Sequence, residues 1–163
     1  MLIMERLYAQ AAARPDHVAL VHGDERIVYG ELVERIERLA HGLGERGIGP
    51  GDPVGLVLRD GPWFVTCLHA VTALGAVAVP VNPAFKQAEI ETCCRMAGVR
   101  AVISDERTAG VCERIAASFD APVDVVTTSS AHGQALTLEE LVERARAARL
   151  APRDPDEVFV YQF

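Results

Sequence analysis

Aromatic residues and long apolar runs are both scarce in this sequence. Only 6% of its 163 residues are Phe, Trp or Tyr, so the core has to be built from Ala, Val, Leu and Ile. The longest apolar runs, such as 76–81, are far too short to span a bilayer. Charged residues interrupt the stretch 1–14, which therefore does not resemble a signal peptide. We expect a soluble, cytoplasmic protein without a transmembrane segment, of a length that suits one domain.

Clustered positive charge is lacking as well. The formal net charge is -7, and the Lys and Arg residues are dispersed among acidic ones rather than gathered in a basic stripe. A protein that follows a phosphate backbone needs such a stripe, so we expect no nucleic-acid partner. The nucleotide-binding patterns G-x-x-x-x-G-K-[ST] and G-x-G-x-x-G are absent, and the single lysine, Lys86, is not in a phosphate loop.

Metal-binding patterns are the third absence. No two of the four cysteines form a C-x-x-C pair, and the five histidines show no H-x-E or H-x-x-x-H spacing. We therefore predict no metal site and interpret the cysteines as buried, reduced thiols of a cytosolic protein: Cys67, Cys93, Cys94 and Cys112.

Helical and strand patterns alternate along the chain. Strands are predicted at 17–21, 26–29, 53–58, 76–81, 100–104, 123–127 and 157–163, and helices at 4–13, 32–43, 62–74, 88–97, 108–119 and 138–150. Thr137 and Glu140 have capping-box spacing, and the polar stretch 128–134 is predicted to be a loop. Strands separated by helices imply right-handed crossovers. We predict an α/β fold with a doubly wound, mostly parallel sheet and flanking helices; residues 1–30 form a helix and a small hairpin, and 51–163 form βαβ repeats.

Four stretches of the sequence carry a resemblance to a known family: 27–32 (IVYGEL), 47–54 (GIGPGDPV), 75–83 (GAVAVPVNP) and 154–163 (DPDEVFVYQF). In this order they resemble the N-terminal segment of the adenylate-forming (AMP-binding) superfamily, which includes acyl-CoA synthetases, aryl-CoA ligases, luciferases and adenylation domains of peptide synthetases. They resemble, in turn, the start of its first long helix, the start of a core strand, a strand and turn, and the strand that precedes the glycine-rich phosphate loop.

The resemblance implies part of an ATP-dependent acid–thiol ligase. Such an enzyme activates a carboxylate, here a fatty or other acyl acid, as acyl-AMP and transfers it to coenzyme A, using ATP, Mg²⁺ and coenzyme A. The phosphate loop, the adenine and ribose motifs and a lysine of the family follow the matched region. We therefore expect residues 1–163 to end before the phosphate loop, to depend on the remainder of the ligase chain, and to be inactive alone, and we assign no catalytic residue and no metal ligand.

The resemblance also implies where coenzyme A would touch this chain. In related synthetases a loop after the matching strand, and an arginine after the next one, contact the nucleotide end of coenzyme A. These roles would fall on Asn82, Pro83, Ala84 and Phe85, and on Arg107. A second arginine expected nearby is missing, since Gly110 and Val111 stand there. The alternative is that these residues only specify the turn and that Arg107 is a solvated charge.

Two other functions stay open. The chain could be a stand-alone Rossmann-like binding or interaction module, or the start of an adenylation domain that loads a carrier protein. The residues that select the acyl group and the acceptor lie downstream in the family, so this sequence predicts neither. If the sheet is cut at its end, an apolar edge near 158–163 is open, which predicts self-association.

Overall fold

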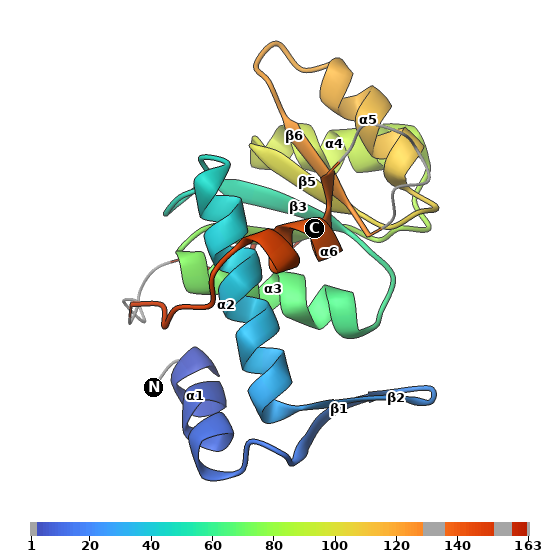
Figure 1. Ribbon diagram of the computed structural model, residues 1–163. Helices are drawn as coiled ribbons and strands as arrows, with labels where there is room; N and C mark the ends of the chain where they lie inside the picture. Colours follow the sequence, from blue (N-terminus) through green and yellow to red (C-terminus); the bar gives the residue numbers. More distant parts are fainter. Residues whose placement is uncertain (1–2, 129–135, 152–157, 163) are drawn as a thin grey trace.

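A computed structural model describes residues 3–128, 136–151 and 158–162. At its centre is a five-stranded parallel sheet of order β4-β3-β5-β6-β7 (Figure 1). The strands are β3 (Pro53–Val57), β4 (Val77–Pro80), β5 (Ala101–Ser104), β6 (Asp124–Thr127) and β7 (Leu136–Thr137). An antiparallel hairpin of β1 (Val18–His22) and β2 (Glu25–Val28) follows helix α1 (Ile3–Ala13). The predicted α/β class, parallel sheet and N-terminal hairpin are confirmed.

Helices cover both faces of the sheet, and each face has its own core. One core lies under α2 (Tyr29–Glu45), α3 (Pro62–Leu74) and α6 (Leu138–Arg144), the other under α4 (Gln87–Ala97) and α5 (Ala109–Ala117). Strand β3 serves both cores because successive side chains of a strand point to opposite faces. Its Leu56 packs in the first core and its Val57 in the second. The sheet is therefore doubly wound, as predicted.

The strand order creates a switch point between β3 and β5. The chain leaves β3 through α3 on one face and reaches β4, whereas it leaves β5 through α5 on the other face and reaches β6. The loops that follow β3 and β5 thus diverge at the carboxyl edge of the sheet. In open α/β sheets, ligands bind in the crevice at such a point.

Two predicted elements differ from the structure near the end of the chain. The helix predicted at 138–150 ends at Arg144, because tertiary contacts hold the following residues in an extended path. The carbonyl of buried Ala145 accepts a hydrogen bond from Nη1 of Arg38, and the amide of Leu150 donates one to the Tyr8 hydroxyl. Strand β7, which pairs with β6, was not predicted. The loop predicted at 128–134 lies outside the described residues except for Thr128.

The strand predicted at 157–163 is reduced to a single parallel bridge between Val160 and Ala78 of β4. The amide of Ala78 donates to the Phe159 carbonyl over 2.8 Å, and the amide of Tyr161 donates to the Ala78 carbonyl over 2.9 Å. These two bonds place the segment beside β4, at the edge of the sheet. Residues 157 and 163 lie outside the described part of the chain.

The capping box predicted at the start of α6 is confirmed. The amide of Glu140 donates to the Thr137 hydroxyl over 3.1 Å, and the amide of Thr137 donates to the Glu140 carboxylate over 2.9 Å. We expect Thr137→Ala to lower the free energy of unfolding by about 1 kcal/mol, because the amide of Glu140 loses its side-chain acceptor. Urea denaturation measures this. Thr137→Ser, which keeps the hydroxyl, should recover most of the loss; an unchanged midpoint in the alanine variant would contradict the assignment.

Candidate functional site

Strands β4, β3 and β5 end in register at the carboxyl edge of the sheet. Leu56 pairs with Pro80 of β4, and Val57 pairs with Ser104 of β5. Neighbouring strands lie about 4.8 Å apart, so the residues that follow the three strands gather at one edge. This edge includes the switch point and all five residues predicted to contact coenzyme A.

The turn after β4 holds four of the predicted contact residues. Oδ1 of Asn82 accepts a hydrogen bond from the amide of Ala84 over 2.9 Å, and the Asn82 carbonyl accepts one from the amide of Phe85 over 3.1 Å. The asparagine thus bonds its own turn, as asparagine side chains in turns commonly do. Pro83 is half-buried, whereas Asn82, Ala84 and Phe85 are exposed, with 39% of Phe85 accessible to solvent. The turn presents an amide and an aromatic ring at a fixed place.

A buried carboxylate, Asp105, organises the end of β5. Only 7% of its side chain is exposed, and its Oδ2 accepts a hydrogen bond from Nε of Arg59 over 2.7 Å. Its Oδ1 accepts from the backbone amides of Arg107 and Thr108, over 3.0 and 3.2 Å. Burial alone would raise the pKa of Asp105, but the Arg59 guanidinium and the two amides together hold that pKa below its ordinary value. The ionised Asp105 carboxylate therefore holds the loop after β3 to the turn after β5.

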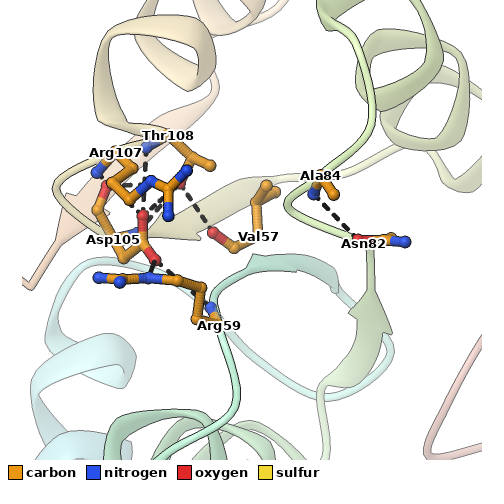
Figure 2. A network of polar contacts seen from close by, with 7 residues as sticks. All are labelled: Val57, Arg59, Asn82, Ala84, Asp105, Arg107 and Thr108. Atoms are coloured by element: carbon orange, nitrogen blue, oxygen red, sulfur yellow. Dashed lines mark hydrogen bonds and ion pairs between the residues drawn. The ribbon is translucent and has the colours of Figure 1, made fainter.

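The Thr108 hydroxyl also connects the ends of β3 and β5. It donates to the Val57 carbonyl at the end of β3 over 2.8 Å and accepts from the amide of Asp105 over 3.2 Å. Figure 2 shows the Asp105 group on one side of Val57 and the Asn82 turn on the other. Two elements of the edge are thus fixed by hydrogen bonds, and β3 lies between them.

The structure places Arg107 in the turn after β5, three positions beyond the end of the strand, and the residue is exposed. Its backbone amide is bound to Asp105, and its guanidinium has no hydrogen-bond or ion-pair partner among the described residues. Arg59, which we did not predict, follows β3, the strand between β4 and β5, and 58% of its side chain is exposed. The sequence did contain one signal for Arg59: it is a charged residue directly after the buried strand predicted at 53–58. Its pairing with Asp105, 46 residues away, had no signal in the sequence.

A cavity of about 480 Å³ lies elsewhere in the molecule, and none of the predicted site residues lines it. Its walls are mainly apolar and come from α1, α3 and residues 149–151 and 159–160. His69 of α3 borders it, and burial lowers the pKa of this histidine. The described residues contain no group of His, Cys, Asp and Glu side chains arranged to hold a metal ion. The residues predicted to contact coenzyme A therefore lie outside this cavity, at the carboxyl edge of the sheet.

The four cysteines are free and buried, as predicted. Burial, together with nearby Cys93 and Glu91, raises the pKa of Cys94 to about 11, and burial raises that of Cys112 to about 12. Within the described ranges, no helix combines the length and apolar character needed to cross a bilayer.

Comparison with known proteins agrees with this architecture. Pyochelin synthase PchD of Pseudomonas aeruginosa is 42% identical over 106 residues, which is 65% of this chain and 19% of that protein. A medium/long-chain-fatty-acid–CoA/3-oxocholest-4-en-26-oate–CoA ligase of Mycobacterium marinum is 39% identical over 79 residues, 48% of this chain and 14% of that protein. The crystal structure of a benzoate CoA ligase from Burkholderia xenovorans superimposes with a TM-score of 0.86 at 23% identity, covering 97% of this chain and 32% of the ligase.

The fold is thus shared with the N-terminal subdomain of adenylate-forming enzymes, and the chain spans less than two thirds of the length of these relatives. A sequence model of the AMP-binding enzymes matches residues 7–163, almost the whole chain. The chain belongs to the AMP-binding enzyme family.

Proposed function

We propose that this chain is the N-terminal part of an ATP-dependent ligase that activates a carboxylate as acyl-AMP and passes the acyl group to the thiol of coenzyme A. The single observation that supports it most is the family match over residues 7–163. In such an enzyme ATP and Mg²⁺ would supply the activation step, for which these 163 residues contain no phosphate-loop motif. The contribution of this chain would be to the scaffold and to acceptor binding.

Coenzyme A as the acceptor is supported by the carboxyl edge. Phe85 offers an exposed ring on which an adenine could stack, and Asn82 has an exposed amide beside it. The guanidinium of Arg107, which has no partner among the residues that the structure describes, suits a phosphate. The relative from Mycobacterium marinum is named as a CoA ligase, and so is the superimposed structure.

A second acceptor has its own support. The relative with 42% identity is a pyochelin synthase rather than a CoA ligase by name. Loading of a carrier protein after adenylation is therefore the alternative that the acceptor experiment has to distinguish. A stand-alone binding module is the remaining alternative, and it has no adenylation activity in any context.

Adenylation is tested by carboxylate-dependent exchange of pyrophosphate into ATP. We expect exchange from the protein of the complete reading frame and none from residues 1–163 alone. Exchange by the 163 residues would refute the assignment of a scaffold role, and its absence from the complete protein across aliphatic and aromatic acids would refute the ligase. In the active protein, acyl-CoA formation supports coenzyme A as the acceptor, whereas acylation of a carrier protein only would favour the alternative.

A cytoplasmic location follows as part of this proposal. Thiols that are buried and unpaired, such as Cys67 and Cys112, are typical of reducing compartments. Both ATP and coenzyme A are cytosolic substrates in the proposed reaction.

Self-association of the chain is expected through the segment beside β4. Val158, Val160 and Tyr161 are 54%, 44% and 42% exposed, and no further strand covers their edge within the part of the chain that the structure describes. We expect light scattering to detect oligomers whose fraction rises with concentration, and Val160→Lys to reduce it. Met96→Lys is the matched control, since Met96 is 69% exposed on α4. A monodisperse monomer at high concentration would contradict the prediction.

A further inference from the structure

We propose that Arg59 is a binding residue for a phosphate group of the nucleotide-bearing acceptor, and that Asp105 is its positioning residue. This inference rests on the proposed acceptor, coenzyme A. It assigns a second cation to the carboxyl edge, from a loop 48 positions before Arg107 in the sequence.

The position of Arg59 is the first reason. It follows β3, which lies between β4 and β5, whereas Asn82 follows β4 on one side and Arg107 follows β5 on the other. Because these strands are paired in register, a ligand that reached from the Asn82 turn to Arg107 would cross the end of β3. The β3–β5 boundary is also the switch point, where ligands of open α/β sheets bind.

The state of the guanidinium is the second reason. Nε of Arg59 is bound to the Asp105 carboxylate, which is itself held by the amides of Arg107 and Thr108. Nη1 and Nη2 have no partner among the described residues, and 58% of the side chain is exposed (Figure 2). Four N–H donors in a planar, anchored group match two oxygens of a phosphate. Asp105 therefore occupies only the Nε donor and leaves the Nη donors available to a ligand. The same bond fixes the orientation of the Arg59 guanidinium.

The start of α3 adds a further attraction for an anion. This helix has 13 residues and begins just after Arg59, with Gly61 as its N-cap and Pro62 in its first turn. Its N-cap glycine has no side chain that could accept from the first amides, and no other side chain among the described residues caps them. The positive end of the helix dipole therefore lies at the same loop as the Arg59 guanidinium.

Charge balance decides how tightly the edge can bind. The loops after the three strands carry equal numbers of cationic and anionic side chains: Arg59, Lys86 and Arg107 against Asp60, Asp105 and Glu106. The net electrostatic attraction of this edge for an anion is therefore small. Binding has to come from hydrogen bonds that the Arg59 guanidinium donates to the ligand. We expect the isolated chain to bind a phosphate ligand weakly. Because the Arg59 donors are oriented, binding should still be selective for phosphate over neutral ligands.

The test uses adenosine 3′,5′-bisphosphate, which reproduces the nucleotide end of coenzyme A, with adenosine and inorganic phosphate as separate probes. Two-dimensional NMR of the 163-residue chain should show the Arg59 Nε–H and the Asn82 amide shifting together with the bisphosphate. We expect Arg59→Gln to weaken binding by about tenfold or more, and Arg59→Lys to recover part of it as a point charge. Shifts with inorganic phosphate at Arg59 alone would assign the phosphate subsite directly.

The matched control is Arg46→Gln. Arg46 also pairs with an aspartate, Asp124, but at the amino end of β6 and so at the opposite edge of the sheet. Its removal should leave binding unchanged. If Arg59→Gln binds as tightly as the unaltered chain while Asn82 still shifts, the inference about Arg59 is wrong and the proposed acceptor stands. If the unaltered chain shows no shift with the bisphosphate, the inference about Arg59 is wrong, whereas acyl-CoA formation by the complete protein still reports the acceptor independently.

Discussion

Asp105→Ala should lower the free energy of unfolding by about 2–4 kcal/mol, a large effect for a single polar side chain. The Asp105 carboxylate is buried and accepts from Nε of Arg59 and from the amides of Arg107 and Thr108. Alanine would leave the two amides without this acceptor where little water reaches, whereas the exposed Arg59 guanidinium would regain solvent. The loss therefore comes mainly from the turn between β5 and α5.

Urea denaturation measures this loss, and Asp124→Ala is its control. Asp124 also pairs with an arginine, Arg46, but both side chains of that pair are about one-third exposed. Solvent screens such a pair, so its removal should cost within about 1 kcal/mol. Equal losses for Asp105→Ala and Asp124→Ala would contradict the role assigned to the buried carboxylate.

The pH dependence gives a second readout for the same residue. The pKa of Asp105 is lowered on folding, so the carboxylate stabilises the folded chain above its ordinary pKa of 3.8 and loses this effect as the pH falls through the folded-state value. In the Asp105→Asn variant the side-chain amide at this position does not titrate. The stability difference between the unaltered chain and Asp105→Asn should therefore be constant from pH 7 to about 5 and shrink below about pH 4. A difference that is independent of pH would show that charge is not involved.

Ile36→Ala should be the most destabilising of the substitutions considered, lowering the free energy of unfolding by about 2–5 kcal/mol. Ile36 is fully buried in α2, in the core that this helix forms with α3, α6 and the sheet. Alanine removes buried methylene and methyl groups and leaves a cavity that a close-packed core fills only in part. Since small domains are stable by about 5–15 kcal/mol in total, this one substitution removes a large share of the chain's stability.

Ile3→Ala separates this effect from a general effect of losing an isoleucine from a helix. Ile3 begins α1 and is 54% exposed. We expect its substitution to change stability by less than about 1 kcal/mol in the same urea titration. If the two alanine variants unfold at similar urea concentrations, the first core does not have the packing described.

The sequence predicted the elements that local residues determine. Helix α3 begins at Pro62 and ends at Leu74 as expected, because Gly61 and Pro62 start it and Gly75 adopts the left-handed conformation (φ 85°) that ends it. The alternation of apolar strands and helices was sufficient for the doubly wound class. The early end of α6 was missed, because contacts from Tyr8 and Arg38, more than a hundred residues earlier, determine it.

The same division between local and distant contacts explains why only part of the candidate site was predicted. The Asn82 turn is local, and both its position and its internal hydrogen bond follow from the residues around it. The pair of Arg59 and Asp105 exists only because β3 and β5 become neighbours after the chain has passed through β4. A single sequence does not contain the strand order, so the place of Arg59 between the Asn82 turn and Arg107 became visible only with the fold.

The buried thiols divide between the two sides of the sheet, and this makes them natural reporters of local opening. Cys67 lies in the core under α2 and α3, while the other three cysteines lie in the core under α4 and α5: Cys93, Cys94 and Cys112. A thiol-specific reagent reaches each of them only when its layer separates from the sheet. Mass spectrometry of the modified peptides over time would therefore rank the two layers by how often each one opens, without any substitution in the chain.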